Sequence, residues 1–413
     1  MLHSEPGCAN EWQPPAEGKR IAIFIYALTG GGAQRRTLTL ANAFVDRGYA
    51  VDVVTVRGRG VLNGELSPRA RLVPLDAGWS RWHPGSLLRK RGLKGYMAIP
   101  GLARYVARCA PDILLSAASH ANIPAILAWH LAGKPAPLVL RASNHPSGNL
   151  QHRPRRYRLF KPLYNRLGGL LYARADAIIA VSKGVAAAVA ELTGLPTERI
   201  TTIYNPMMGQ LAAASATPPV PHPWLEPGQP PVVLGAGRLA IQKDFGTLIR
   251  AFALLRRQRQ ARLVILGEGA KRPDLEALVG ALGLQDDVLL PGYVHNASRW
   301  MAGAAVFVLS SLWEGLPGVL IEALAAGCPV VSVDCPSGPR EILDDGRYGA
   351  LVPARAPEAL AAAIVATLAA PRQPDLLRTR AAAFSRERSV AQYLEVLEGL
   401  MSPQRRKVRT SPG

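Results

Sequence analysis

The sequence has few acidic residues and few cysteines, and each shortage narrows the class of protein. Its 29 Asp and Glu residues stand against 49 Lys and Arg residues in 413, which gives a formal charge of +20. Cys8, Cys109, Cys328 and Cys335 are scattered, with no CxxC pair and no neighbouring histidine cluster. They therefore predict neither a disulfide framework nor a zinc site, and they favour the reducing cytoplasm.

Long apolar runs are also lacking. Each apolar stretch is broken by Arg, Pro or Gly before it reaches the roughly 20 residues that a membrane-spanning helix needs. Residues 1–18 lack the basic start and apolar core of a signal peptide, so we expect a disordered leader there. Any membrane contact should be peripheral, and the positive charge favours anionic partners.

Short apolar runs alternate with helical patterns along most of the chain. The run "RIAIFIYAL", the glycine turn "TGGGAQ", the helical pattern "RRTLTLANAFVDRG" and the run "YAVDVVTV" predict a βαβ unit with parallel strands. The alternation pauses in a Pro- and Ala-rich stretch and then resumes. The pattern predicts an α/β fold with two Rossmann-like, doubly wound parallel-sheet domains that face each other across a cleft.

The same pattern predicts the domain organisation. We expect an N-terminal domain over 19–208, a linker over 209–230 and a C-terminal domain over 231–383. A C-terminal helix over 384–402 is expected to pack back on the N-terminal domain, and a basic tail follows over 403–413.

Two glutamates lie in the segment "SSLWEGLPGVLIEALAAGCPVV", residues 310–331. The pattern predicts Glu314 in the turn after a strand, and Glu322 in the following helix, on the side that faces the cleft. Both could bind a ligand. The segment alone equally allows a capping carboxylate and a solvated helix glutamate.

Three further loops follow strands of the second half. The loop "GAGRLAIQKD" presents Arg238 and Lys243, which suit an anionic diphosphate or are solvated surface cations. The loops "LGEG" and "PGYV" place Gly267, Gly269 and Tyr293 where backbone can approach a flat base or a ribose, or they are ordinary turns.

Taken together, these segments resemble the retaining glycosyltransferases of family 4, from "TGGGAQ" through "EGLPGVLIEALAAG" to "CPSGPREIL". The resemblance implies the GT-B fold, with the acceptor on the N-terminal domain and a nucleotide sugar on the C-terminal domain. It implies that Arg238 and Lys243 bind the donor diphosphate, Glu322 the ribose and Glu314 the transferred sugar. It also implies that three backbone N–H groups face the sugar and phosphate: those of Gly315, Leu316 and Gly318.

The glycine turn of the N-terminal half has an alternative as a nicotinamide-binding turn. Its glycines do not follow GxGxxG, and the strand "VDVVTVRG" ends without the acidic residue that would bind an adenosine ribose. The resemblance instead makes Gly30, Gly31 and Gly32 a close-packed turn beneath the transferred sugar.

Polar residues also follow two strands of the N-terminal half. His120 in "SHANIP" matches a family histidine beside the sugar and the acceptor, although a lone histidine is often a structural hydrogen-bonding group. Asn144 and His145 in "RASNH" are weaker candidates that could orient the acceptor or the donor sugar.

The expected chemistry follows in part from what is absent. No DxD triplet is present to clamp a metal on the phosphates, so we predict no metal and no cofactor. The resemblance implies a retaining transfer in which the acceptor hydroxyl attacks on the face that the diphosphate leaves. Its "CPSGPREIL" segment favours a UDP-sugar over a GDP-sugar, with N-acetylhexosamine or galactose as the sugar.

Basic and aromatic residues are mixed in two stretches of the N-terminal half, 81–108 and 152–172. Such a mixture suits the anionic inner leaflet of a membrane, and it also occurs on solvated helix faces and in RNA-binding proteins. Because the acceptor half carries both stretches, we predict a lipid-linked glycan acceptor, peripheral membrane binding and no nucleic acid. The expected cations are Arg153, Arg155, Arg156, Arg158 and Lys161.

Two alternatives from other classes remain. A nucleotide-sugar epimerase of the same fold would need acid–base residues around the sugar, and the glutamate spacing suits transfer better. A basic nucleic-acid-binding protein would explain the charge but not the glutamate segment.

Overall fold

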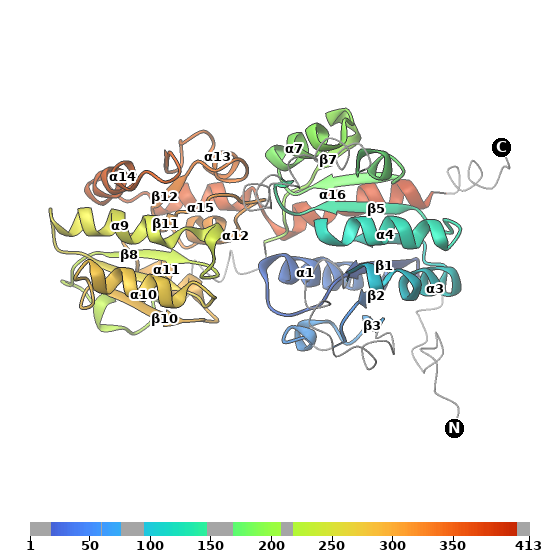
Figure 1. The fold of residues 1–413 in the computed structure, drawn as a ribbon, viewed down its shortest axis with the longest axis horizontal. Coiled ribbons are helices and arrows are strands. Elements are labelled where there is room, and N and C mark those ends of the chain that lie inside the picture. Colours follow the sequence, from blue (N-terminus) through green and yellow to red (C-terminus); the bar gives the residue numbers. More distant parts are fainter. Residues whose placement is uncertain (1–17, 59, 76–94, 147–167, 208–217, 403–413) are drawn as a thin grey trace, which may run out of the picture.

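The computed structural model describes residues 18–58, 60–75, 95–146, 168–207 and 218–402. They form two parallel-sheet α/β domains that lie side by side (Figure 1). The predicted leader, the basic tail, about half of the linker and the five cations between 153 and 161 lie outside the described residues. Among the described residues, no helix is both long and apolar enough to cross a membrane.

The N-terminal domain contains a seven-stranded sheet in the order β3-β2-β1-β4-β5-β6-β7. All of its strand pairs are parallel. Every residue of β2 and β5 is buried, as expected for parallel strands that are covered on both faces. The strands are β1 (Arg20–Ile25), β2 (Ala50–Thr55), β3 (Arg71–Pro74), β4 (Ile113–Ser116), β5 (Leu138–Ala142), β6 (Ala177–Ala180) and β7 (Ile200–Thr202).

Helices cover both faces of this sheet. The residues of α1 pack in one hydrophobic cluster with those of α16, and the residues of α3, α4 and α7 pack in another on the opposite face. The helices of the domain are α1 (Gly32–Asp46), α3 (Ile99–Cys109), α4 (Ser119–Leu131) and α7 (Lys183–Thr193), with short 3₁₀ segments η1 (Asn63–Glu65) and η5 (Thr197–Arg199).

The C-terminal domain repeats this plan with a six-stranded parallel sheet in the order β10-β9-β8-β11-β12-β13. Its strands are β8 (Val232–Ala236), β9 (Arg262–Leu266), β10 (Val288–Gly292), β11 (Val306–Leu309), β12 (Val330–Val333) and β13 (Ala350–Val352). Its helices are α9 (Phe245–Arg256), α10 (Arg272–Ala281), α11 (Ala297–Gly303), α12 (Gly318–Ala325), α13 (Pro339–Leu343), α14 (Pro357–Ala369) and α15 (Pro374–Ala382), with η6 (Pro223–Leu225) and η7 (Ile241–Lys243). The predicted class of two doubly wound parallel-sheet domains is confirmed.

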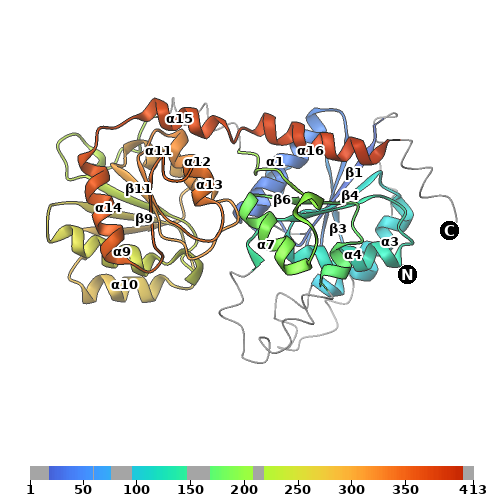
Figure 2. The same ribbon diagram turned by 90° about the horizontal axis from the view of Figure 1, so that it is seen from above.

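The chain returns to the N-terminal domain at its end through α16 (Arg386–Met401), which lies along that domain beside α1 (Figure 2). Val390, Tyr393 and Leu397 recur at helical spacing and are fully buried in the cluster that α1 also lines. Met207 and Ser385 pair in a parallel bridge, so the outgoing and returning chains run side by side between the domains.

In each sheet the strand order reverses once, between β1 and β4 in the first and between β8 and β11 in the second. In open parallel sheets, ligands bind beyond the carboxyl ends of the strands at this reversal. The glycine turn follows β1, and His120 lies in the first turn of α4, just after β4. Arg238 and Glu314 lie in the loops after β8 and β11. The topology therefore predicts a site at these four strand ends.

Candidate active site

The loop after β11 is fastened to the loop after β8. The Ser310 hydroxyl donates to the Lys243 carbonyl at 2.7 Å, and the Leu312 N–H donates to the Gln242 carbonyl at 2.8 Å. The Gln242 side-chain amide donates to the Trp313 carbonyl at 2.8 Å. These bonds fix the backbone that carries Glu314 against the backbone that carries Lys243.

Glu314 and Lys243 form an ion pair at the carboxyl end of the sheet. Lys243 Nζ lies 2.6 Å from Glu314 Oε1, and their side chains are 15% and 9% exposed, respectively. The lysine stem packs over Gly237, where an added Cβ would lie 2.9 Å from Lys243 Cε. Because both charges are largely removed from water, each depends on the other for compensation.

Glu322 lies in α12 and reaches the N-terminal domain. Its Oε1 lies 2.9 Å from Nη2 of Arg36 in α1, and the two side chains are 26% and 11% exposed. The same guanidinium lies over Gly318, where a Cβ would be 2.3 Å from Nη2. An ion pair thus joins the domains at the glutamate predicted to bind the ribose.

Arg238 lies beside the glycine turn of the other domain. Its Nη2 would be 3.9 Å from a Cβ added to Gly31, and within the described residues it has no hydrogen-bond or ion-pair partner. Gly30 has a φ of +107°, which favours glycine, and the Gly31 N–H donates to Gln34 Oε1 at 3.1 Å. A Cβ on Gly32 would meet no atom of another described element within 4 Å, and the position of this turn beneath the transferred sugar stays a prediction.

Gly267 and Gly269 are explained by packing between loops. A Cβ on Gly267 would lie 1.9 Å from the Gly237 carbonyl oxygen, and one on Gly269 would lie 2.3 Å from that of Leu239. The two loops are also paired through backbone hydrogen bonds. Their assignment to the nucleotide stays a prediction, and these contacts account for the glycines without it.

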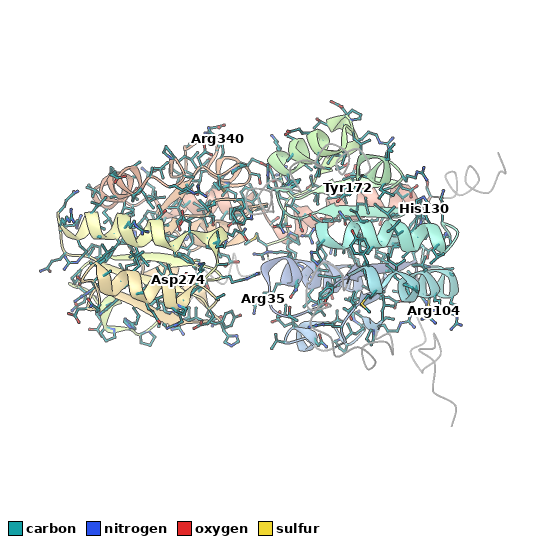
Figure 3. The ribbon with its side chains drawn as sticks, in the orientation of Figure 1. Arg35, Arg104, His130, Tyr172, Asp274 and Arg340 are labelled. Atoms are coloured by element: carbon teal, nitrogen blue, oxygen red, sulfur yellow. The ribbon has the colours of Figure 1, made fainter. Side chains whose placement is uncertain are left out.

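Tyr293, the other residue predicted near the nucleotide, is exposed. Its hydroxyl accepts a hydrogen bond from Nη2 of Arg35 at 2.8 Å, and its ring meets that of His295 edge-on. Arg35 reaches from α1 toward the C-terminal domain (Figure 3). This contact again joins the two domains.

The loop between Glu314 and α12 lies against the N-terminal domain. The Gly315 carbonyl accepts a hydrogen bond from the Ser182 hydroxyl at 2.9 Å, and a Cβ on Gly315 would lie 2.3 Å from the Ser143 carbonyl oxygen. Within the described chain, three backbone N–H groups of this loop have no hydrogen-bond acceptor: those of Gly315, Leu316 and Gly318. They are therefore available to bind an anion.

The N-terminal candidates come from two adjacent loops. The Ser143 N–H donates to Ser119 Oγ at 2.9 Å, which holds the loop after β5 against the start of α4. His120 follows Ser119, and its ring lies 6.3 Å from that of Tyr26 after β1. Asn144 follows Ser143, and its Cα would be 3.3 Å from a Cβ on Gly315. The structure thus brings Asn144 against the glutamate loop.

Burial lowers the pKa of both candidate histidines. For His120 the cause is desolvation, although the residue is still partly exposed. For His145 burial also lowers the pKa, and the charge of Glu191 opposes the shift. Neither ring is therefore favoured as a cation by its surroundings.

Three residues at the domain boundary were not predicted from the sequence. Arg35 and Arg36 follow the glycine turn, near the start of the predicted helix. The helix dipole disfavours cations there, so these two arginines could have been recognised from the sequence as candidates for binding an anion. Glu341 accepts hydrogen bonds from the Lys183 and Gly184 N–H groups, both at 2.8 Å, and so caps α7 from the other domain.

Metal and thiol chemistry find little support among the described residues. No group of three His, Cys, Asp or Glu side chains in that part of the chain could hold a metal ion. Burial raises the pKa of Cys328 and Cys335 to about 12, so both thiols stay protonated.

Comparison with known families identifies the class. Residues 30–207 match the family model described as Glycosyltransferase Family 4, and residues 230–370 match that described as Glycosyl transferases group 1. The chain therefore belongs to the glycosyltransferases with the GT-B fold and is family 4-like, as its motifs predicted. Both matched models describe transferases, which favours transfer over the epimerase alternative.

Among curated relatives, a Campylobacter jejuni protein is 29% identical over 342 residues, covering 81% of this chain and 86% of that protein. It is named N-acetylgalactosamine-N,N'-diacetylbacillosaminyl-diphospho-undecaprenol 4-alpha-N-acetylgalactosaminyltransferase. The lipopolysaccharide core glycosyltransferase LpsE of Rhizobium meliloti is 36% identical over 180 residues, 41% of this chain and 51% of that protein.

Solved structures share the fold. Anabaena HepE, solved with UDP and glucose, has a TM-score of 0.71 at 21% identity and covers 92% of this chain and 100% of its own. A glycosyltransferase from Rickettsia africae has a TM-score of 0.73 at 19% identity, covering 94% of this chain and 99% of its own. These likenesses confirm the predicted GT-B fold.

Proposed function

We propose that this glycosyltransferase moves a hexose or N-acetylhexosamine, with retention of configuration, from a UDP-sugar to a lipid-linked glycan in bacterial cell-surface polysaccharide synthesis. The observation that carries the proposal is the Glu314–Lys243 pair, which lies at the strand reversal of the C-terminal domain. Glu322 follows on α12 and pairs with Arg36 from α1 of the N-terminal domain. Such a set of charges suits a diphosphate with a sugar on one side and a ribose on the other.

The donor binds mainly to the C-terminal domain. Arg238 and Lys243 bind the diphosphate, which Arg238 can do without breaking another contact among the described residues. The free N–H groups of the loop before α12 add donors to the phosphate and the sugar. Glu314 binds the sugar hydroxyls and Glu322 the ribose hydroxyls, since a carboxylate is a strong acceptor for both. UDP is favoured because the structural neighbour HepE is solved with UDP.

The transfer needs no protein nucleophile. The acceptor hydroxyl oxygen bonds to C1 of the sugar on the face from which the diphosphate oxygen departs, and the hydroxyl proton passes to a phosphate oxygen. Arg238, Lys243 and the N-terminus of α12 stabilise the charge that develops on the leaving group. His120 and Asn144 orient the sugar and the acceptor from the N-terminal domain.

The acceptor is proposed to be lipid-linked, presented at the anionic inner leaflet. Its support is the named undecaprenol-linked substrate of the Campylobacter relative and the surface of α3 and α4. Leu131, the last residue of α4, is 67% exposed, and the cations Arg104 of α3 and Lys134 just after α4 are also exposed. Arg104 and His130 lie at the end of the N-terminal domain that is far from the C-terminal domain (Figure 3). Mixed apolar and cationic side chains suit a membrane interface.

One experiment separates the proposed function from the alternatives. Purified chain is mixed with radiolabelled UDP-N-acetylgalactosamine, UDP-N-acetylglucosamine, UDP-galactose or UDP-glucose and with a bacterial lipid extract, and label in the organic phase is counted. We expect label to move to lipid with at least one donor. Isomerised nucleotide sugar without transfer would favour the epimerase. If no donor gives either transfer or isomerisation, the proposal is refuted.

A matched control tests the membrane step. Leu131→Gln on the exposed end of α4 should weaken sedimentation with anionic liposomes, because apolar insertion is lost. Leu282→Gln, also on an exposed leucine but in the C-terminal domain, should leave sedimentation unchanged. Equal binding of both variants and wild type to neutral and anionic liposomes would exclude this surface as the docking site.

A further inference from the structure

We propose that Arg36 is a donor-binding residue that changes its partner as the donor binds. In the structure it pairs with the Glu322 carboxylate, and in the donor complex it pairs with the diphosphate. The inference rests on the proposed function, because it requires a nucleoside diphosphate in this site. Arg36 belongs to the N-terminal domain, so the exchange would let the acceptor domain contact the donor directly.

The first argument is the identity of its present partner. Arg36 Nη2 lies 2.9 Å from Glu322 Oε1, and the arginine side chain is only 11% exposed. A ribose offers two neighbouring hydroxyl groups, which would engage both oxygens of a carboxylate. The guanidinium takes up one side of Oε1, so a ribose hydroxyl that approaches this oxygen from that side displaces Arg36.

The second argument is position. The Arg36 guanidinium lies over Gly318, the first residue of α12, where a Cβ would come within 2.3 Å of Nη2. The Gly318 N–H, which has no acceptor among the described residues, is one of the groups assigned to the donor phosphate. When the guanidinium leaves Glu322, it is therefore already beside the expected position of the diphosphate. Its planar fork can then bind two phosphate oxygens.

The third argument is the balance of charge. Arg36 and Lys243 each have a carboxylate partner here, whereas Arg238 has none among the described residues. The first turn of α1 contains no acidic residue, and the carboxylate partners of Arg35 and Arg36 come from other elements: Glu65 at 3.6 Å and Glu322 at 2.9 Å. A diphosphate carries more negative charge than one carboxylate, so pairing with it would compensate for the loss of the Arg36–Glu322 pair.

The exchange predicts opposite effects on two ligands. A nucleoside competes with Arg36 for Glu322 and offers the arginine no phosphate, so removing Arg36 should not weaken its binding. A nucleoside diphosphate gains Arg36 as a ligand, so removing Arg36 should weaken its binding. If Arg36 only joins the two domains through its ion pair, its removal should change the affinities for the nucleoside and for the nucleoside diphosphate by the same factor.

The test measures dissociation constants of uridine, UDP, guanosine and GDP for wild type, Arg36→Ala and Arg36→Lys by calorimetry or competition. For the nucleotide that wild type binds, Arg36→Ala should weaken the diphosphate roughly tenfold or more. The matching nucleoside should bind as well as before or up to about fivefold more tightly. Arg36→Lys should fall between, because it keeps the charge and loses the fork.

Arg47→Ala is the matched control. It removes an arginine from the end of the same helix, where its guanidinium contacts only the Ala43 carbonyl among the described residues. It should leave all four affinities unchanged. The ratio of nucleoside to diphosphate dissociation constants within each variant does not depend on the fraction of correctly folded protein.

The outcomes separate this inference from the proposed function. If wild type binds neither UDP nor GDP, the proposed function fails and the inference fails with it. If wild type binds one of them and Arg36→Ala leaves the ratio unchanged, the inference alone is wrong. Should the nucleosides bind too weakly to measure, a loss of diphosphate affinity below threefold in Arg36→Ala would equally overturn it.

Discussion

Replacing Glu314 with Gln should destabilise the free enzyme and yet strengthen its binding of UDP. The substitution keeps the shape of the side chain and removes its charge, which leaves Lys243 without the partner that lies 2.6 Å away. Breaking a fully buried pair costs about 3–5 kcal/mol, and exposures of 15% and 9% reduce this to about 2–3 kcal/mol. A domain of this size should then lose roughly 4–12 °C in melting temperature.

The UDP diphosphate should restore part of that loss. UDP lacks the transferred sugar, so its binding does not need Glu314. In the variant, Lys243 has no carboxylate partner, so it can pair with the diphosphate without first breaking an ion pair. Recovering about 1 kcal/mol would tighten UDP about fivefold. Turnover should fall about a hundredfold, because the sugar loses a carboxylate that is held in place for the transition state.

Thermal unfolding with and without UDP, calorimetry and steady-state kinetics measure these three effects. Glu276→Gln is the matched control, since it breaks an exposed pair with Arg272 on α10 and should cost less than about 0.5 kcal/mol. A Glu314→Gln variant with wild-type melting temperature and weaker UDP binding would refute the reasoning.

Three further predictions follow from the same structure. Glu322→Ala should weaken UDP about tenfold while turnover at saturating donor changes little, because a ribose contact is shared by ground and transition states; a change in turnover alone, seen in steady-state kinetics, would contradict it. Transfer should persist in excess EDTA, because Arg238 and Lys243 face the diphosphate; an absolute requirement for Mn²⁺ or Mg²⁺ would exclude this mechanism. Burial, aided by a hydrogen bond to Glu398, raises the pKa of Tyr49 from 10.0 to about 12. The stability contributed by this bond between Tyr49, which follows α1, and Glu398 of α16 is therefore complete below pH 10 and is lost as the pH rises toward 12. Tyr49→Phe should therefore lose less stability than wild type between pH 10 and pH 12 in denaturant titrations, and equal losses would show that this contact does not matter.

The strands and the site loops could be predicted because their causes are local. Buried parallel strands are continuous apolar runs, and the glycine turns after them mark the carboxyl ends where ligands bind. Glu314, Lys243 and Arg238 could thus be placed near one another from strand order alone. The ion pair between Lys243 and Glu314 could not be predicted, because 71 residues separate the two in the sequence.

The features that were missed depend on contacts between distant segments. Arg36 lies 286 residues from Glu322, and no local pattern links them. Residues 218–225 were expected in the linker, yet Arg299 bonds the Pro218 and Pro219 carbonyls and holds them on the C-terminal domain. A Pro- and Ala-rich composition signals irregular backbone and says nothing about the side chains of other elements that reach it.

The anomeric configuration of the product tests the central claim most directly. The purified enzyme is given an α-linked UDP-sugar and lipid acceptor in EDTA, and the freshly formed glycosidic bond is assigned by NMR. A same-face transfer gives an α-linked product, whose formation should fall about a hundredfold in Glu314→Gln. A β-linked product, or full activity in Glu314→Gln, would contradict a same-face transfer at the site that joins the two domains.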